Sequence, residues 1–253
     1  MKVFKSVVLT GKNLFLTTAI DEVSVLERKR KMGTEGSIWS ESFQFKAGKQ
    51  GEWIEDGKFL RAGVSVVVLV PDIKQFKVIL NRFDSGHPTA AGKLSTPAGV
   101  WEGKKSLLDA ALKELGEEVI LVDSFGLVFW AFDNRFLSKD WAEKYARENG
   151  IEKFNDAKIK IEPFESPETI AIYLDGVYQG QAILAYESEN GGIEIMFLFM
   201  TKETINGFIL KDGENFDGQW LNREVGFFSL DDLSKESEKT TKVDVVEKLL
   251  KSF

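Results

Sequence analysis

The feature that most constrains the fold is the run Val64-Ser65-Val66-Val67-Val68-Leu69-Val70, in which six of seven residues are branched and apolar. Branched side chains favour strands, and near-continuous apolar character predicts a strand that is buried on both faces of a sheet. Pro71-Asp72 ends the run, and residues 76–80 are expected to return as its hairpin partner. The chain is therefore expected to be built around a central strand rather than a helical bundle.

The rest of the chain mixes strand and helix patterns. Apolar runs predict further strands at 125–132, 169–174, 181–186 and 193–200. Helices are expected at 106–119, at 138–149 with Ser138 as N-cap and Gly150 as stop, and at the C-terminus, where apolar residues repeat at three- and four-residue steps from Val243 to Phe253. Residues 151–168 are rich in Pro and charge, which predicts a loop. This order of elements predicts an α+β fold.

Residues 1–60 have a different character, with short apolar runs that predict a β-rich N-terminal extension or small domain. Trp39, Glu41, Phe43 and Phe45 alternate as in a half-buried strand, and Asp56-Gly57 is typical of a hairpin turn. Residues 61–253 are expected to form the main domain, with an insertion around 133–190. Whether residues 1–60 fold separately or add strands to the main sheet is open at this stage.

Composition excludes several chemistries. The chain has no cysteine and one histidine, His87, which rules out thiol catalysis, disulfides and multi-histidine metal sites. A formal net charge of -7 makes nucleic acid an unlikely partner. No apolar run is long enough to span a membrane, and the N-terminus lacks a secretory signal, so a cytoplasmic location is expected. Carboxylates, lysines, arginines and tyrosines are left as the candidate catalytic groups.

The 106–119 segment carries the most informative pattern. At 100° per residue, Leu108, Leu112, Leu115 and Val119 form a core stripe, while glutamates at i, i+3 and i+4 form an adjacent face, namely Glu114, Glu117 and Glu118. Like charges at these steps repel each other, and Lys113 is expected to lie to one side of them. A hard divalent cation such as Mg²⁺, which prefers oxygen ligands, would account for the cluster. A plain solvated helix face is the alternative.

The residues around this helix resemble the Nudix box, G-x5-E-x7-R-E-U-x-E-E-x-G-U with U aliphatic. Gly99 takes the first position after a Pro97-Ala98-Gly99 turn, and Glu114, Leu115, Glu117, Glu118 and Leu121 take theirs. Leu80-Asn81-Arg82 resembles the L-x-R strand end before the box, and residues 224–233 resemble the late strand-to-helix run. The resemblance covers about 61–253 and implies a Nudix-type α/β/α sandwich with a mixed sheet.

Three positions depart from the box. Lys105 replaces the first glutamate, although Glu102 lies nearby, and Lys113 replaces the arginine. Ile120 replaces the late glycine, and because a β-branched residue disfavours positive φ, the helix is expected to end differently or to run on. Gly116 lies inside the helix, where it costs about 1 kcal/mol relative to Ala.

The resemblance implies a hydrolase that uses Mg²⁺ or Mn²⁺ to cleave a diphosphate linkage in a nucleoside diphosphate derivative. Glu117 and Glu118 are then expected as metal ligands, and Glu114 as ligand or general base. Lys113 would hold the carboxylates in place as a point charge. The alternative is a Nudix-fold nucleotide-binding or regulatory module without turnover, which Lys105 and Ile120 motivate, and a third is a scaffold for protein contacts.

Other site candidates rest on weaker grounds. Arg61 and Arg82 are candidates for substrate phosphate, although an ordinary surface arginine is the simpler interpretation of each. The family often uses one more acidic residue outside the box, and the candidates here are Glu187, Glu189, Glu194 and Glu224. Glu102, inside the box, is a further acidic candidate. Trp101 and Trp130 are expected in the core rather than against a nucleobase. The 151–190 stretch is open to three interpretations: a cap over the site, a homodimer contact or an inert insertion.

Overall fold

The predicted central strand is present. The computed structural model describes residues 4–10, 13–18, 44–45, 59–60, 62–73, 75–86, 90–101, 105–164, 170–174, 177–187, 193–203, 205, 208–212 and 222–251. Strand β5 (Ala62–Pro71) contains the apolar run, and its residues from Val64 to Val70 are at most 4% exposed. It pairs antiparallel with β6 (Phe76–Phe83) through Leu69 and Val78. Both the strand and its hairpin partner are therefore confirmed.

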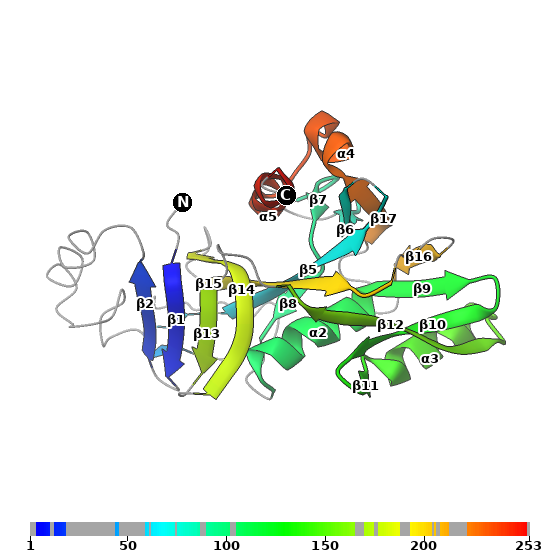
Figure 1. Ribbon diagram of the computed structural model, residues 1–253, viewed down its shortest axis with the longest axis horizontal. Coiled ribbons are helices and arrows are strands. Elements are labelled where there is room, and N and C mark those ends of the chain that lie inside the picture. Colours follow the sequence, from blue (N-terminus) through cyan, green and yellow to red (C-terminus); the bar gives the residue numbers. More distant parts are fainter. Residues whose placement is uncertain are drawn as a thin grey trace, which may run out of the picture. The chain divides into compact units, whose positions relative to one another are not determined.

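The chain forms two compact units, the first comprising Met1–Ser65, Ala98–Ala111 and Pro163–Leu198, and the second Val66–Pro97, Leu112–Glu162 and Phe199–Phe253. Figure 1 labels the elements of both units. Four elements, β5, α2, β12 and β15, have residues in both. The division cuts across the expected boundary at residue 60, so the order of domains along the chain stays a prediction.

The first unit is mainly strands. Strand β1 (Phe4–Thr10) forms an antiparallel hairpin with β2 (Asn13–Thr18) and runs parallel to β13 (Ile170–Leu174). Strand β13 continues antiparallel to β14 (Val177–Glu187), and β14 to β15 (Ile193–Thr201). The short strands β3 (Gln44–Phe45) and β4 (Phe59–Leu60) pair separately. Residues from the N-terminal stretch thus join a sheet with residues from the expected insertion.

The predictions for the N-terminal stretch have mixed coverage. Residues 46–58 and 19–43 lie outside the described residues, so the Asp56-Gly57 turn and most of the Trp39–Phe45 alternation are not described. The strands expected at 169–174 and 181–186 are present as the antiparallel pair β13 and β14, and residues 175–176 between them are likewise outside the described residues.

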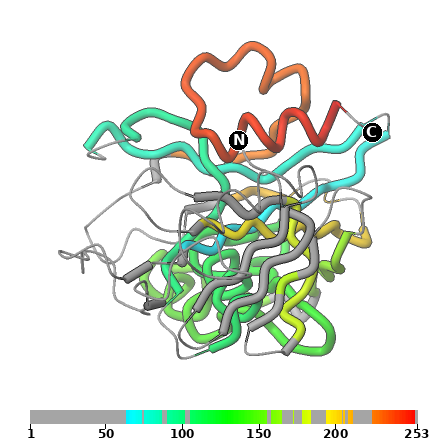
Figure 2. Tube along the Cα trace, turned by 90° about the vertical axis from the view of Figure 1, so that its left-hand side faces the viewer, coloured from blue at the N-terminus to red at the C-terminus, as the bar shows by residue number. Residues whose placement is uncertain are grey.

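The second unit contains one part built around β6. Strand β17 (Asn222–Ser229) pairs with β6 along its whole length, and β7 (Leu94–Ser95) pairs with its end. Two helices follow β17, namely α4 (Leu230–Lys235) and α5 (Thr241–Leu250). The backbone N–H of Leu94 donates to Glu238 O and that of Thr240 to Leu94 O, which ties the link between the helices to β7. Figure 2 shows this C-terminal segment in orange and red.

The other part of the second unit begins in helix α2 (Leu107–Glu118), which passes directly into β9 (Val119–Asp123). Strand β10 (Gly126–Phe132) pairs antiparallel with β9 and parallel with β12 (Phe154–Pro163), and β16 (Ile209–Asp212) pairs with β9. The connection from β10 to β12 runs through β11 (Arg135–Phe136) and α3 (Lys139–Glu148). Parallel and antiparallel pairs together make a mixed sheet, and the α+β prediction is confirmed.

The loop expected over 151–168 is wrong, because β12 occupies most of it. Ile159 and Ile161 are buried, while Lys160 and Glu162 between and after them are exposed. The alternation has period two, which is the pattern of a half-buried strand. The charged residues of this segment lie on its solvent-facing side, and their number made the alternation hard to recognise in the sequence.

The departure at Ile120 follows from how α2 ends. The helix stops at Glu118 and the chain enters β9, so residue 120 has strand geometry and needs no positive φ. Ile120 packs in a cluster with Leu127 and Phe129 of β10 and with Tyr145 and Ala146 of α3. A glycine here would leave a gap in that cluster.

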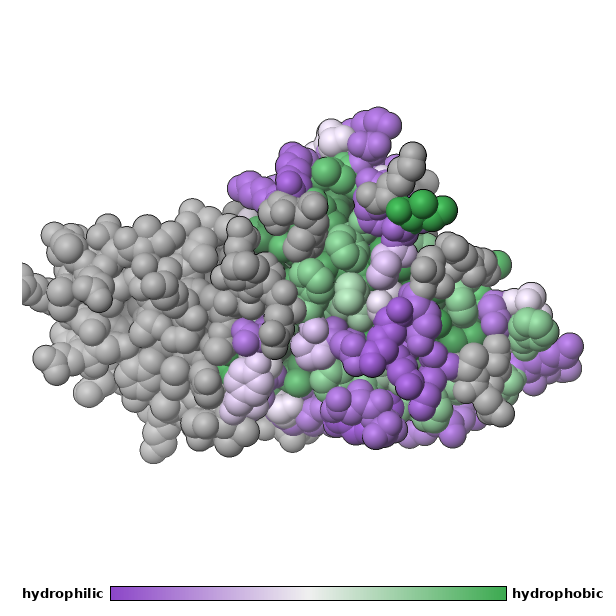
Figure 3. Space-filling model, in the orientation of Figure 1, coloured by the Kyte–Doolittle hydropathy of each residue, from purple (hydrophilic) through white to green (hydrophobic). Residues whose placement is uncertain are grey.

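Surface character is mixed. Hydrophilic and hydrophobic side chains both reach the face of the described part that Figure 3 shows. Within the described ranges, six large apolar residues are exposed: Ile73, Phe125, Phe136, Phe154, Tyr178 and Ile209. Among the residues that the structure describes, no helix combines the length and apolar character needed to cross a bilayer.

Candidate functional site

Helix α2 begins with a side-chain cap and is held by its apolar stripe. The hydroxyl of Ser106 accepts a hydrogen bond from the backbone N–H of Asp109 at 2.9 Å and donates to its carboxylate at 2.8 Å. The first N–H of the helix, that of Leu107, donates to Gln179 Oε1 at 3.0 Å. Capping satisfies N–H groups that have no partner within a helix, and Leu112 and Leu115 then anchor its buried side.

The three glutamates lie at the other end of this helix, in its last two turns. The side chains of Glu114 and Glu117 are 16% and 19% exposed, and Glu118 is buried at 3%. The last turn contains no basic residue. Negative charge at a helix C-terminus is unfavourable, because the backbone carbonyls there already carry partial negative charge. The glutamates are thus closely spaced, largely desolvated and placed where the helix itself disfavours them.

Lys113 does not lie to one side of the glutamates, which corrects the helical-wheel expectation. Its Nζ is 2.5 Å from Glu117 Oε2 and 3.7 Å from Glu114 Oε1. A flexible four-carbon stem lets the ammonium reach back over the next turn of the helix. One lysine thus contacts two of the three carboxylates.

Asn81 is a site residue that the sequence reasoning passed over. It is 1% exposed in β6, and its Nδ2 donates to Glu118 Oε2 at 2.9 Å. The signal was visible as a lone amide after the apolar residues Val78, Ile79 and Leu80. A buried polar residue in an apolar strand requires a partner, and here that partner is a glutamate 37 positions away.

Gly116 has a structural purpose. A Cβ at this position would lie 2.7 Å from Ser138 Cβ and 3.1 Å from the carbonyl carbon of Leu137. Ser138 is the residue before α3, as expected, but its hydroxyl makes no capping bond and instead donates to Lys113 O at 3.1 Å. The missing side chain lets this segment pack directly on the helix turn that carries the glutamates.

Gly99 and Lys105 lie in the first unit. Gly99 belongs to strand β8 (Ala98–Val100) and pairs with Val64, so the expected tight turn there is wrong. Lys105, at the position of the first glutamate of the box, is exposed, and its carbonyl accepts a bond from Trp101 Nε1 at 2.7 Å. Trp101 and Trp130 are both buried, as expected for core residues.

Arg82 is held within the second unit by acidic groups. Its Nη2 lies 2.5 Å from Glu236 Oε2, its Nε lies 3.3 Å from Glu224 Oε2, and its Nη1 donates to Gly92 O at 2.8 Å. The Glu236 contact raises the pKa of Arg82, and the same contact lowers the pKa of Glu236 below its usual value. Arg82 therefore already contacts two carboxylates, those of Glu224 and Glu236, in this structure.

The remaining candidates are spread over the chain. Glu194, in the first unit, is partly buried, and its carboxylate lies so close to Gly63 that a Cβ there would be 2.2 Å from Oε1. Glu187 ends β14, and its side chain is outside the described part. Arg61, His87, Glu102 and Glu189 lie outside the described residues.

The glutamates do not form a ready-made metal cage. Among the described residues, no three acidic or histidine side chains are grouped closely enough to hold an ion as they stand. The donor set nevertheless fits a hard divalent cation, because Glu114, Glu117 and Glu118 offer only oxygen. The buried side chain of Asn81, which contacts Glu118, adds a polar atom, Oδ1, that has no hydrogen-bond partner within the described part.

Comparison with known proteins gives matches only at the level of structure. No family model and no curated protein sequence matches the chain. A Nudix hydrolase from Alicyclobacillus acidocaldarius matches at 12% identity and a TM-score of 0.43, over 77% of this chain and 92% of that one. A C. elegans Ap4A hydrolase matches at 11% identity and 0.40, over 77% and 100%.

A third match is a bifunctional NMN adenylyltransferase/ADP-ribose pyrophosphatase from Francisella tularensis, in complex with AMP and a manganese ion. It has 15% identity and a TM-score of 0.41, over 76% of this chain and 41% of that one. Because these TM-scores are below 0.5, the function proposed below rests on the residues of this chain. The Alicyclobacillus acidocaldarius protein is a Nudix hydrolase, the family that residues 99–121 resemble.

Proposed function

We propose that this protein is a metal-dependent hydrolase that cleaves a diphosphate linkage in a nucleoside diphosphate derivative. The observation that carries the proposal is the glutamate cluster, in which Glu114, Glu117 and Glu118 share the last two turns of α2 with no basic residue in the last turn. A fold retains an arrangement that opposes helix stability when the arrangement serves another purpose. Binding of a cation is the purpose that this chemistry supports best.

Glu117 and Glu118 are the proposed ligands of Mg²⁺ or Mn²⁺, and Glu114 is a third ligand or the general base. When bound, the cation would polarise a phosphoryl oxygen and lower the pKa of a water molecule. Lys113 already contacts Glu114 and Glu117, so it keeps these two carboxylates near each other without a metal. The proposed substrate is a nucleotide-type small molecule, and a cytoplasmic location is proposed with it.

Lys105 favours a second candidate function, a nucleotide-binding module without turnover. The first glutamate of the box is absent, and the lysine in its place is exposed. A site with fewer carboxylates holds less positive charge near the substrate, which weakens stabilisation of the transition state. Such a module would still bind a nucleotide through a cation.

The test is the formation of monophosphate products, separated by chromatography, from a panel of nucleoside triphosphates, sugar nucleotides and dinucleoside polyphosphates, with and without Mg²⁺. Turnover that requires Mg²⁺ and is lost in Glu117→Gln is the expected result. The matched control is Glu143→Gln on α3, because Glu143 makes the same i,i+4 contact with a lysine, Lys139, at 3.5 Å. This control should retain full activity.

Two other outcomes decide against a hydrolase. Thermal stabilisation by a nucleotide and Mg²⁺ without any product would favour the binding module. The absence of both turnover and stabilisation across the panel would contradict both functions.

A further inference from the structure

Asn81 is held rigidly in the second unit. It lies in β6 opposite Val225 of β17 and opposite Ser95 of β7, so its backbone is paired with strands on both sides. The neighbouring side chains of Ile79 and Leu80 are fully buried. From this paired strand the amide donates its Nδ2 to Glu118 Oε2, 2.9 Å away.

The Asn81–Glu118 pair is costly for the fold. Both side chains are at least 97% buried, and Asn81 Oδ1 makes no hydrogen bond with any residue that the structure describes. Replacing a buried polar pair by apolar groups of the same shape is nearly neutral or stabilising. The hydrogen bond between Asn81 and Glu118 therefore does not by itself account for these two residue types at these two positions.

The chemistry of the bond indicates a different role. Asn81 is a neutral donor, so it orients the Glu118 carboxylate without cancelling its charge. Lys113 acts differently on Glu117, because an ammonium competes with a bound cation for the same negative charge. Residues that hydrogen-bond to a metal ligand orient it, and their loss typically weakens metal binding about 10- to 100-fold.

We propose that Asn81 is a positioning residue that holds Glu118 in the orientation required to bind the divalent cation. This inference rests on the proposed function, since it needs Glu118 to be a ligand. It assigns the residue between Leu80 and Arg82 a role that neither its strand nor its burial requires.

The test is the affinity for Mn²⁺ alone, measured by calorimetry on the full chain, together with the melting temperature. Asn81→Leu removes the donor and nearly preserves the volume, and it should weaken Mn²⁺ binding about 10- to 100-fold. The matched control is Thr96→Val, because Thr96 is equally buried and its hydroxyl also lacks a partner within the described part. It should bind Mn²⁺ as the wild type does.

Each outcome decides the question. A folded Asn81→Leu with wild-type Mn²⁺ affinity would overturn the positioning role and leave the hydrolase intact. Equal weakening in Thr96→Val would also overturn it, since the effect would then be general to buried polar groups. If the wild type binds no Mn²⁺, the proposed function and this inference fail together. Should Asn81→Leu not fold, Asn81→Ala adds no volume and carries the same expectation.

Discussion

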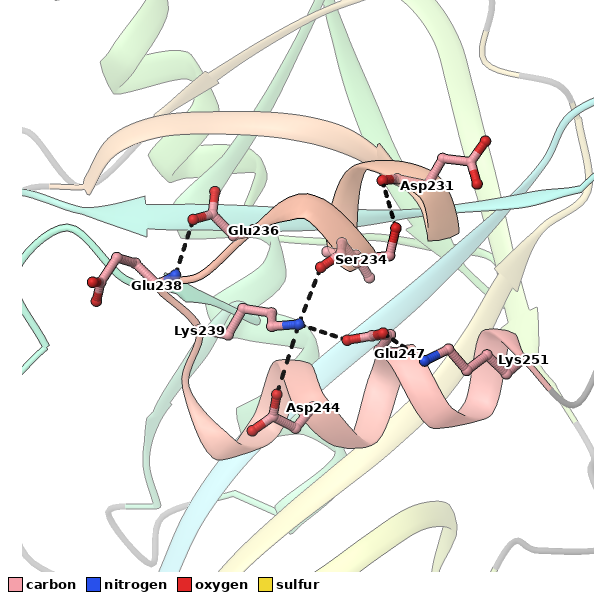
Figure 4. Close-up of polar contacts among 9 residues, drawn as sticks. Asp231, Ser234, Glu236, Glu238, Lys239, Asp244, Glu247 and Lys251 are labelled. Atoms are coloured by element: carbon pink, nitrogen blue, oxygen red, sulfur yellow. Dashed lines mark hydrogen bonds and ion pairs between the residues drawn. The ribbon is translucent and has the colours of Figure 1, made fainter.

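Helices α2 and α5 differ in where their charged residues lie and in how many lysines contact each carboxylate. Helix α5 has Asp244 in its first turn and Lys248 in its last, which is the distribution that the helix dipole favours. Its largely buried Glu247 accepts bonds from Lys239 at 2.6 Å and Lys251 at 2.7 Å (Figure 4). Helix α2 instead ends on Glu117 and Glu118, with no basic residue in that turn.

The comparison separates two uses of the same side chain. Around Glu247, two lysines surround one carboxylate, and they lower its pKa, Lys239 more than Lys251. On α2, one lysine contacts two of three clustered carboxylates. The C-terminal cluster therefore stabilises the fold by itself, while the α2 glutamates are the proposed ligands of a cation.

The largest expected effect is on catalysis, when a glutamate of α2 is replaced. Glu118→Gln should lower kcat/KM by about 100- to 1,000-fold, or about 3–4 kcal/mol, because it removes a ligand's charge. Its free energy of unfolding should change little, since the substitution also removes negative charge from a helix C-terminus. Turnover assays and urea unfolding measure the two quantities. Full activity in Glu118→Gln would contradict the proposal that the α2 glutamates bind a cation required for turnover.

The sequence predicted α2 well because its information is local. Leu112 and Leu115 mark the buried side and the glutamate spacing marks the adjacent one, as the structure shows. The burial of Glu118 was not predictable, because it depends on a strand 37 residues earlier in the chain. Likewise the pairing of β1 with β13 joins residues about 165 positions apart, and no local pattern encodes it.

The fate of Gly116 illustrates the same limit. From the sequence alone, only the cost of this glycine to the helix could be inferred, about 1 kcal/mol relative to Ala. Its benefit depends on Leu137 and Ser138, which approach from another segment. The contact of Lys113 with Glu117 was only partly predictable. The i,i+4 spacing that allows it is visible in the sequence, but the helical wheel placed the lysine to one side of the glutamates.

The next largest effect is expected on the free energy of unfolding, when Glu247 of α5 is replaced. Glu247→Gln should cost about 2 kcal/mol of unfolding free energy at neutral pH, the range for hydrogen bonds to charged groups. Because the folded-state pKa of Glu247 is lowered from 4.5, its contribution is fully present above that pH and is lost as pH falls through the folded value. The wild type should thus lose stability on acidification, and Glu247→Gln should lose less.

Urea unfolding from pH 7 to pH 3 measures this, with Asp244→Asn as the control. Asp244 is 55% exposed and 4.0 Å from Lys239, so its removal should change stability by only a few tenths of a kcal/mol. Parallel pH profiles in the wild type and Glu247→Gln would show that the lysine cluster is not what stabilises this end of the chain.

A smaller effect is expected at the turn that positions the α2 glutamates. Gly116→Ala should lose about 1–2 kcal/mol, because overpacking against Ser138 and Leu137 outweighs the gain in helix propensity. The double variant with Ser138→Gly should recover part of this, since it removes the Cβ and Oγ that the alanine would meet and suits the φ of 46° at position 138. Thermal unfolding compares the three proteins, and a stabilised Gly116→Ala would show that the segment moves aside at no cost.

The smallest effect distinguishes the N-caps of α4 and α5. The hydroxyl of Ser229 accepts from Asp232 N, and the Asp232 carboxylate accepts in return from Ser229 N at 2.8 Å, which completes a capping box. Thr240 precedes α5 at the same position, but its hydroxyl makes no capping bond. Ser229→Ala should therefore cost about 1 kcal/mol in urea unfolding, and Thr240→Ala close to nothing. Equal losses would mean that the cost depends on the residue type and not on the capping hydrogen bond. The placement of charge that distinguishes α4 and α5 from α2 would then have to stabilise these two helices without a contribution from their caps.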